Sequence, residues 1–174
     1  MGQAAPRGRD RAGGLALTGT GATPPVPALE RLFRVDAVVG PVRDLGVTRA
    51  GHRRIVDIVG GRVSGAVDAK VLPGGADWQI VQPDGTIEID TRYTAVTASG
   101  GLVHLRTRGV RTGPPEVLEA LLAGDDVPPT AYSFRLVVDV ETSAPELAHL
   151  QRCLIVAAAL RAADRVVYDA YRVT

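Results

Sequence analysis

The sequence has very little of the residue types that form covalent or metal cross-links. Its 174 residues include one cysteine and three histidines. A single cysteine cannot form an intramolecular disulfide, and His52, His104 and His149 lack the short spacings of a zinc site. We therefore expect no metal and no other cofactor. Cys153 lies in an apolar run, which predicts a buried and unreactive thiol.

Charge of one sign, aromatic residues and long apolar runs are also scarce. The net charge is +1, and aromatic residues make up 4% of the chain. Without a basic excess or a set of stacking aromatic side chains, nothing indicates a nucleic-acid partner. No apolar run approaches the roughly 20 residues that a membrane-spanning helix needs. We expect a cytoplasmic protein that binds neither nucleic acid nor membranes.

Several enzyme motifs are missing as well. The sequence contains no Gly-x-Ser-x-Gly nucleophile elbow and no phosphate-binding loop. It also has no β-α-β alternation, which excludes a parallel sheet and a Rossmann-type dinucleotide site.

The composition divides the chain into two regions. Residues 1–27 are rich in Gly, Ala, Pro, Thr and Arg and have no hydrophobic period. Such a segment cannot bury enough apolar surface to offset the entropy lost on ordering, so we interpret it as a flexible leader. Residues 28–174 are expected to form one domain, since the whole chain has an ordinary single-domain length.

Alternation of apolar and polar residues with a period of two dominates the second region. Val63 and Val71 share one face of a predicted strand, and Arg62 and Lys70 share the other. This pattern is typical of antiparallel strands with one buried face. It predicts strands near residues 32–39, 52–59, 62–71, 78–82, 86–97, 102–110, 132–141, 153–160 and 165–173. The first of them should end at Gly40-Pro41 and the second at Gly60-Gly61.

Two short helices interrupt the strands. The first is predicted after Pro114 and should end at Gly124, with an apolar stripe of leucines and a valine between them. The second is predicted near residues 147–151, where Ser143 and Glu146 have the spacing of a capping box.

These elements predict an all-β fold, an antiparallel β-barrel of about eight or nine strands with two short helices. A β-sandwich is the alternative. The barrel is favoured because strand glycines such as Gly65 and Gly109 suit barrel bends, and because closure removes exposed strand edges. The fold is compatible with a homo-oligomer.

Several stretches resemble a bacterial family known only as domain of unknown function 3237. The similar residues are Gly46 to Gly51 with Arg53-Arg54, Gly60-Gly61, Val71 to Trp78, Asp84-Gly85, Asp90 to Tyr93, Tyr132 to Arg135, Glu141-Thr142 and Tyr168-Asp169. The resemblance covers about residues 32–174, and Pro-Gly-Gly-Ala-Asp-Trp is its most specific part. It implies a β-barrel similar to the allene oxide cyclase and dirigent barrels, and it implies no established activity.

The chain departs from this family at two places. His149-Leu150-Gln151 stands where the family usually has Trp-Leu-Asn, and Ser99-Gly100-Gly101 stands where it usually has an Asp-Gly turn. If the tryptophan and asparagine line a pocket in relatives, the ligand of this chain differs or its site is altered.

Asp77 and Trp78 are the first candidate site residues, because they follow two glycines at the entrance to a strand. They could place a carboxylate and an indole wall at the barrel mouth, where ligands bind. Equally, Asp77 could accept backbone N–H bonds of the loop while Trp78 closes the end of the barrel.

Asp90 and Arg92 share a face of one strand, as do Arg135 and Glu141 of another. Inside a barrel, an Asp–Arg pair could bind a carboxylate or an enolate. On the outside, the same residues would form solvated ion pairs.

Tyr132 and His149 complete the candidates. Any of the four tyrosines Tyr132, Tyr93, Tyr168 and Tyr171 could act as a general acid at a forming enolate, although a packed tyrosine with one satisfied hydroxyl is the alternative. A histidine titrates near neutral pH. The predicted catalytic residues are Asp77, Asp90, Arg92, Tyr132 and His149, and the predicted ligand-binding residues are Trp78, Arg135 and Glu141. We expect the pocket to open beside residues 74–78, lined by Asp90, Arg92, Tyr132 and the helix that carries His149.

Two functions from different classes fit these residues. The first is a cofactor-free isomerase, cyclase or lyase that uses acid–base catalysis on a small organic substrate held in the barrel. The second is a barrel that binds a hydrophobic metabolite without changing it. The polar candidates come as acid–base pairs rather than single anchors, which favours the enzyme.

Overall fold

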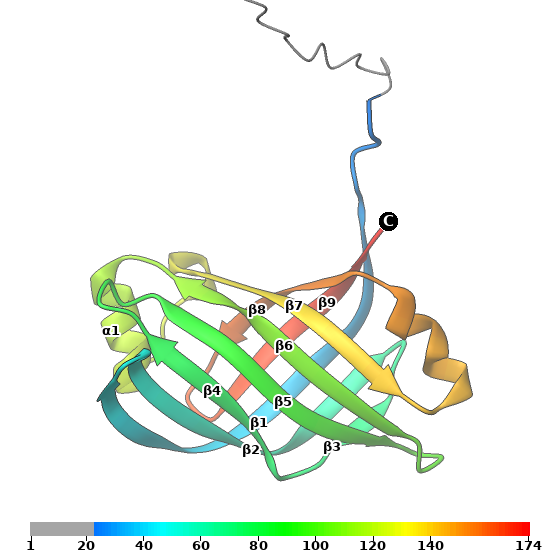
Figure 1. Cartoon of the computed structure of the whole chain (residues 1–174), viewed down its shortest axis with the longest axis horizontal. Coiled ribbons are helices and arrows are strands. Elements are labelled where there is room, and N and C mark those ends of the chain that lie inside the picture. Colours follow the sequence, from blue (N-terminus) through cyan, green and yellow to red (C-terminus); the bar gives the residue numbers. More distant parts are fainter. Residues whose placement is uncertain (1–22) are drawn as a thin grey trace, which may run out of the picture.

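The computed structural model describes residues 23–174, which form an all-β, antiparallel barrel (Figure 1). Its nine strands are β1 (Leu29–Thr48), β2 (Gly51–Gly65), β3 (Ala69–Val71), β4 (Gly75–Val81), β5 (Ile87–Thr97), β6 (Leu102–Thr112), β7 (Ser133–Thr142), β8 (Ile155–Arg161) and β9 (Arg165–Val173). The predicted fold class is therefore confirmed. Of the predicted leader, residues 1–22 lie outside the described part, and residues 23–27 contain no helix or strand.

The sheet closes on itself because β1 pairs with both β9 and β2. From β5 to β9, each strand pairs with the next one along the chain. Between β2 and β5, the gap is shared by β3 and β4, each of which pairs with both neighbours. These two short strands together occupy the place of one long strand, so the barrel has eight strand positions built from nine strands.

The first strand is longer than its sequence predicts. Gly40 and Pro41 do not end β1, because the register shifts between Val39 and Val42 and both residues are left without ladder partners. Proline cannot donate a backbone hydrogen bond, and this irregularity removes the need for one. Beyond it, β1 no longer pairs with β9 and continues as a hairpin with β2 alone.

The second strand likewise runs through the predicted stop at residues 60–61. Gly61 has a φ of 134°, and a Cβ atom there would lie 2.1 Å from the carbonyl oxygen of Asp36 on β1. The glycine therefore allows close pairing of two strands instead of a turn. The chain turns later, at residues 66–68, between β2 and β3.

Helices cover both ends of the barrel (Figure 1). At one end lies α1 (Pro115–Ala123), which buries Leu118 and Leu121 and ends at the left-handed Gly124 as predicted. A short 3-10 helix, η1 (Pro129–Ala131), follows it and was not predicted from the sequence. The second predicted helix is a 3-10 helix, η2 (Pro145–Arg152), at the opposite end. Its predicted capping box is absent, since no side chain of the described residues caps its first turn.

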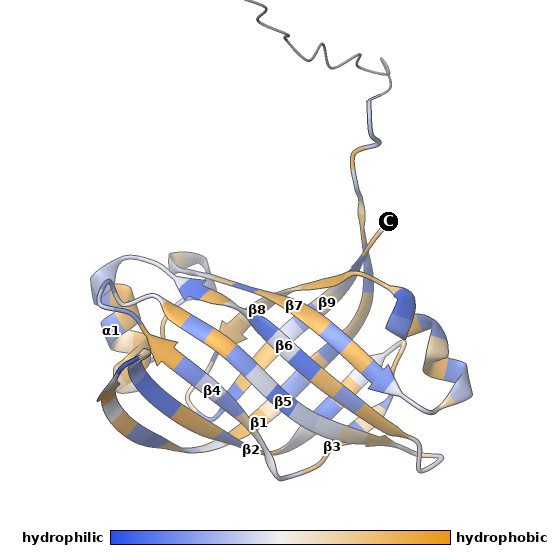
Figure 2. Ribbon diagram, viewed as in Figure 1, coloured by the Kyte–Doolittle hydropathy of each residue, from blue (hydrophilic) through white to orange (hydrophobic). Residues whose placement is uncertain are grey.

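The period-two pattern separates a buried apolar interior from a polar outer surface. Figure 2 shows hydrophobic and hydrophilic residues alternating along the strands. In β5, for example, Ile87, Ile89 and Tyr93 are buried, whereas Glu88 is exposed. The prediction for Cys153 was wrong in one respect, because the thiol is only partly buried at the end of η2.

Candidate functional site

The barrel interior contains a cavity in the half that α1 covers. Its walls come from eight strands and are mostly apolar. The lining residues are Ala37, Val39, Val56, Ile58, Asp77, Gln79, Ile89, Thr91, Tyr93, Thr107, Phe134, Leu136, Arg161, Val166 and Tyr168. The free space between them is about 470 Å³, counting the part open to solvent, but the centre of a water molecule can occupy only about 30 Å³. That is room for a few waters, so a larger molecule has to displace side chains.

The lining residues that are partly exposed mark the mouth of the cavity. They are Val39 on β1, and Arg161 and Val166 on either side of the β8–β9 turn. The other lining residues are buried. A ligand would therefore enter beside the β8–β9 turn.

A row of polar side chains crosses the otherwise apolar wall. Asp77 on β4 pairs with Thr91 on β5, and Thr91 pairs with Thr107 on β6. All three are buried and line the cavity. Cross-strand neighbours on one face lie about 5 Å apart, so the sheet register places a carboxyl and two hydroxyls side by side.

Asp77 is the buried carboxyl of this row, with 6% of its surface exposed. Its Oδ2 accepts a hydrogen bond from Gln79 Nε2 at 2.7 Å, whereas its buried Oδ1 has no partner within residues 23–174. Burial raises the pKa of Asp77, although the hydrogen bond from Gln79, the nearby Thr91 hydroxyl and Asp90 backbone, and the charge of Arg111 act in the opposite direction. The group is thus a carboxyl that holds its proton to higher pH than an exposed aspartate and has one oxygen available.

Two tyrosines lie across the cavity from each other. The hydroxyls of Tyr93 on β5 and Tyr168 on β9 are 2.5 Å apart, and both residues are buried. Burial raises the pKa of each hydroxyl, so both remain neutral hydrogen-bonding groups at ordinary pH.

Arginines lie at the end of the barrel under α1. Arg161 lines the cavity mouth, and Arg111 on β6 is only 3% exposed, with its guanidinium 5.8 Å from the ring of the lining residue Phe134. Burial and the neighbouring Arg161 lower the pKa of Arg111 to about 10, so it stays cationic at neutral pH. Arg54 on β2 is close enough to lower the pKa of both other arginines.

The structure brings two of the predicted site residues to this end of the barrel. Asp77 lines the cavity. Tyr132 is buried, and its hydroxyl accepts a hydrogen bond from the backbone N–H of Arg161 at 2.9 Å. Tyr132 therefore holds the cavity mouth in place and does not itself line the cavity.

Asp90, Arg92 and Trp78 do not enter the lumen, and the prediction that the first two line it was wrong. Asp90 accepts hydrogen bonds from Arg92 and Arg106, and the Arg92 guanidinium lies 5.5 Å from the Trp78 ring. These side chains belong to the outer face because their chain neighbours occupy the inner face: Thr91 and Tyr93 in β5, and Asp77 and Gln79 in β4.

A separate surface hollow lies beside residues 73–75, near the predicted position of the pocket. Trp78, Arg92 and His104 line it, but neither Tyr132 nor residues of η2 do. The close approach expected at Gly75 also has another cause. A Cβ atom there would lie 2.5 Å from Tyr93 Cβ, so it is strand β5 that needs the glycine.

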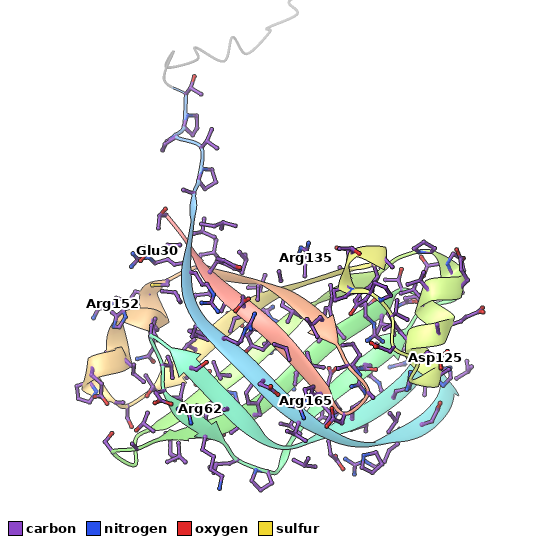
Figure 3. The ribbon with its side chains drawn as sticks, turned by 180° about the vertical axis from the view of Figure 1, so that it is seen from behind. Glu30, Arg62, Asp125, Arg135, Arg152 and Arg165 are labelled. Atoms are coloured by element: carbon purple, nitrogen blue, oxygen red, sulfur yellow. The ribbon has the colours of Figure 1, made fainter. Side chains whose placement is uncertain are left out.

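The three remaining candidates do not line the cavity. Arg135 and Glu141 are exposed on the outer face of β7, and Figure 3 shows Arg135 projecting outward from the barrel. His149 is exposed on η2, at the end opposite α1. The predicted convergence of these residues on one pocket was therefore wrong.

Sequence reasoning missed most of the polar lining. It did not name Gln79, Thr91, Thr107 or Arg161, and it considered Tyr93 and Tyr168 as general acids without choosing them for the site. One signal was present, because Ile87 and Ile89 share the face of Thr91 and Tyr93, and an apolar face in a barrel is the inner one.

Within residues 23–174, no group of three or more His, Cys, Asp or Glu side chains is arranged to hold a metal ion. No helix in the same range has both the length and the apolar character needed to cross a membrane.

The fold and the cavity define an antiparallel β-barrel with a partly polar internal pocket. By sequence, the chain belongs to the family described as protein of unknown function (DUF3237), which matches residues 27–173. The resemblance seen in the sequence is thereby confirmed. A UPF0311 protein of Bradyrhizobium diazoefficiens is 42% identical over 142 residues, which are 82% of this chain and 93% of that protein.

Solved structures show the same barrel. A conserved protein of unknown function from Rhodopseudomonas palustris has a TM-score of 0.82 at 37% identity, over 87% of this chain and all of that one. A beta-barrel-like protein from Acinetobacter baumannii has a TM-score of 0.76 at 40% identity, over 87% of this chain and 99% of that one. A protein described as an enzyme from Penicillium herquei has a TM-score of 0.66, over 88% of this chain and 99% of that one. At 18% identity, it is similar in fold alone.

Proposed function

We propose that the barrel is a cofactor-free enzyme, an isomerase, cyclase or lyase, that uses acid–base chemistry on a small organic molecule in its cavity. The observation that carries the proposal is Asp77, a buried carboxyl on a cavity wall with a raised pKa and an Oδ1 that has no partner within residues 23–174. Leaving a buried polar atom without a partner is costly, so such groups concentrate at functional sites.

In this proposal, Asp77 moves the proton. Gln79 holds Oδ2, which fixes the plane of the carboxyl and leaves Oδ1 to face the substrate. A carboxyl with a raised pKa can donate a proton to one atom of a substrate, and the resulting carboxylate can take a proton from another. This sequence leaves the enzyme unchanged, as an isomerisation, a ring closure or an elimination requires.

The other lining groups position the substrate and stabilise developing charge. The neutral hydroxyls of Tyr93 and Tyr168 can donate hydrogen bonds to an oxygen that becomes negative in the transition state. The apolar walls from Ile58, Ile89 and Leu136 exclude water and restrict the conformations of a bound molecule, which lowers the entropic part of the barrier.

The likeness to the Penicillium herquei protein adds a smaller piece of support. That protein is described as an enzyme, which agrees with an active site in a barrel of this shape. Fold likeness alone does not transfer an activity, so the proposal depends on Asp77 and its surroundings.

The test is a search for proton transfer to carbon. The protein is incubated in D₂O with a panel of small enolisable carbonyl compounds, and mass spectrometry follows deuterium incorporation and conversion to isomers. We expect exchange or isomerisation with at least one compound, and its loss in Asp77→Asn. The matched control is Asp90→Asn, which removes a carboxyl from the outer face of the neighbouring strand. Equal rates in Asp77→Asn and the parent protein would contradict the proposal.

A second candidate is a binding barrel for a hydrophobic metabolite, and the predominance of apolar side chains in the lining favours it. The two functions differ in what native mass spectrometry and extraction would recover. If the protein is a binder, extraction after prolonged incubation recovers the same co-purified compound, chemically unchanged, from the parent protein and from Asp77→Asn. An enzyme converts its compound, and only the variant preserves it.

A further inference from the structure

Three arginines gather at the end of the barrel that α1 covers, and no ion pair within residues 23–174 accounts for them. Arg54 lies on β2, Arg111 near the end of β6 and Arg161 at the end of β8. Arg111 is almost fully buried, and the other two are partly buried. We refer to them as the arginine cluster.

The cluster differs from the surface arginines in its partners. On the outer face, Arg34, Arg106 and Arg165 each hydrogen-bond a carboxylate, which raises the pKa of each guanidinium. In the cluster, the Nε atoms of Arg54 and Arg111 are buried and have no hydrogen-bond partner within residues 23–174. Their pKa is lowered by burial, the reverse of the shift at the surface.

The carboxylates nearest the cluster do not neutralise it. Asp164 is close to Arg161, but its oxygens accept hydrogen bonds from Arg165. Asp44 is close to Arg54, but its Oδ1 lies 2.6 Å from His52 Nε2. Asp77 also faces the cluster, and burial favours its neutral form. Buried cations without counter-charges destabilise a fold, so their presence indicates a ligand that supplies the negative charge.

The arginine cluster adjoins the cavity that contains Asp77. Arg161 lines the cavity, and Arg111 stacks near Phe134, which also lines it. Arg161 is fixed by three contacts: its backbone N–H donates to the Tyr132 hydroxyl, and its Nη1 donates to the carbonyl oxygen of Ala162 and, at 3.1 Å, to that of Arg165. A molecule bound at the cluster would therefore extend its apolar part toward Asp77.

We infer that the substrate is a small organic acid whose carboxylate binds the arginine cluster while its apolar body occupies the cavity beside Asp77. A planar guanidinium matches a carboxylate in a bidentate pair, and the pairing is strong where water is excluded. The substrate class rests on the proposed function, because Asp77 supplies the chemistry. The anion site itself rests only on the cluster.

The experiment compares acids with their neutral analogues. The probes are acetate, benzoate and 3-phenylpropanoate, each with its matching amide, and inorganic phosphate. Each is used at about 10 mM, where ligands with millimolar Kd fill much of a site. Two-dimensional ¹H–¹⁵N NMR follows the side-chain Nε–H signals of Arg111 and Arg161. We expect the acids with an apolar body to shift both signals and to bind about tenfold or more tightly than their amides, as a charge-assisted hydrogen bond predicts.

The variants are Arg111→Met and Arg161→Met, with Arg108→Met as control. Arg108 lies on the outer face of β6 and pairs with Asp139. Each cluster variant should lose the preference for acids, and the control should keep it. Because Arg111→Met removes a buried cation, its melting temperature should equal or exceed that of the parent protein, an outcome that a purely structural role would not produce. Arg161→Met, at the partly exposed mouth, provides a second measurement if Arg111→Met does not fold.

Three results would overturn the inference. They are equal affinity for acids and amides, no shift of either arginine signal by any acid, and tighter binding of inorganic phosphate than of every acid. Failure of the proposed function would look different. In that case the acids bind the cluster as expected, but no compound of the panel exchanges a proton in an Asp77-dependent way.

Discussion

The hydroxyl pair of Tyr93 and Tyr168 allows a quantitative test of how the cavity is built. The two oxygens are 2.5 Å apart, and each residue is 3% exposed. Replacing one tyrosine by phenylalanine keeps the ring and removes one hydroxyl, which leaves the other hydroxyl buried without its partner. Replacing both removes the polar pair from the interior.

The expected free-energy changes follow from this asymmetry. A buried hydroxyl that loses its partner costs about 1–3 kcal/mol, whereas removing both partners can be nearly neutral. Tyr93→Phe and Tyr168→Phe should each lower the free energy of unfolding by about that amount. The double variant should be destabilised by clearly less than the sum, with a coupling energy on the order of 1 kcal/mol or more.

Urea unfolding monitored by circular dichroism measures all four corners of the cycle. The dependence on urea concentration should be the same for each variant, so that midpoints report stability. In thermal scans, each single variant should unfold about 2–4 °C lower for every 1 kcal/mol lost. Tyr171→Phe, on the partly exposed part of β9, serves as control and should change stability by less than about 0.5 kcal/mol. Additive effects of the two single substitutions would show that the hydroxyls do not depend on each other, which contradicts the geometry described above.

Three further predictions test other parts of the structure. Because the pKa of Asp77 is raised in the folded state, the folded protein binds more protons than the unfolded chain between the two pKa values. The contribution of Asp77 to stability should therefore fall as pH rises above about 4, by about 1.4 kcal/mol for each pH unit between its unfolded-state and folded-state pKa. Asp77→Asn should accordingly gain stability relative to the parent protein over the same range, and parallel pH profiles would refute this. Gly61→Ala places a Cβ atom 2.1 Å from Asp36 O at a φ of 134°. It should lower the free energy of unfolding by more than the roughly 1–3 kcal/mol typical of backbone strain alone. In the same denaturant titration, Gly60→Ala should be far milder, because its Cβ atom would have no neighbour nearer than 4.0 Å. Asp90→Asn breaks the half-exposed pairs with Arg92 and Arg106 and should cost no more than about 1 kcal/mol, less at high salt; a larger, salt-independent loss would contradict its position on the outer face.

The strand pattern predicted the barrel because side-chain alternation is a local property. The strands from β4 to β9, the positions of α1 and η2 and the Gly124 stop all follow from short stretches of sequence, whereas the predicted strand at residues 62–71 is divided between β2 and β3. The two wrong strand ends have a non-local cause. Gly61 predicts a turn unless it is known that Asp36 of the neighbouring strand lies against it. Pro41 likewise predicts the end of a strand unless the shifted register of β1 and β2 is known.

The candidate site was only partly predictable for a similar reason. Asp77 could be named from the glycines that precede it, but its unpaired oxygen depends on burial by other strands. Tyr93 and Tyr168 are 75 residues apart, and the cluster of Arg54, Arg111 and Arg161 draws on three strands, so no local spacing reveals either group. The choice of Asp90 and Arg92 was wrong because it was based on their pairing as acid and base, and not on which alternate residues of β5 face inward. Its apolar residues had already identified the opposite face as the inner one.

Titration of the Asp77 carboxyl tests the proposed proton transfer without a known substrate. Carbon-13 NMR of the aspartate carboxyl groups as a function of pH, with the signal assigned by its absence in Asp77→Asn, reports the pKa of this group in the folded protein. We predict that Asp77 titrates clearly above the ordinary aspartate value of 3.8, and that Asp90, paired with Arg106 on the outer face, titrates below it. An Asp77 signal that titrates at or below the ordinary value would contradict its role as the proton donor of the cavity.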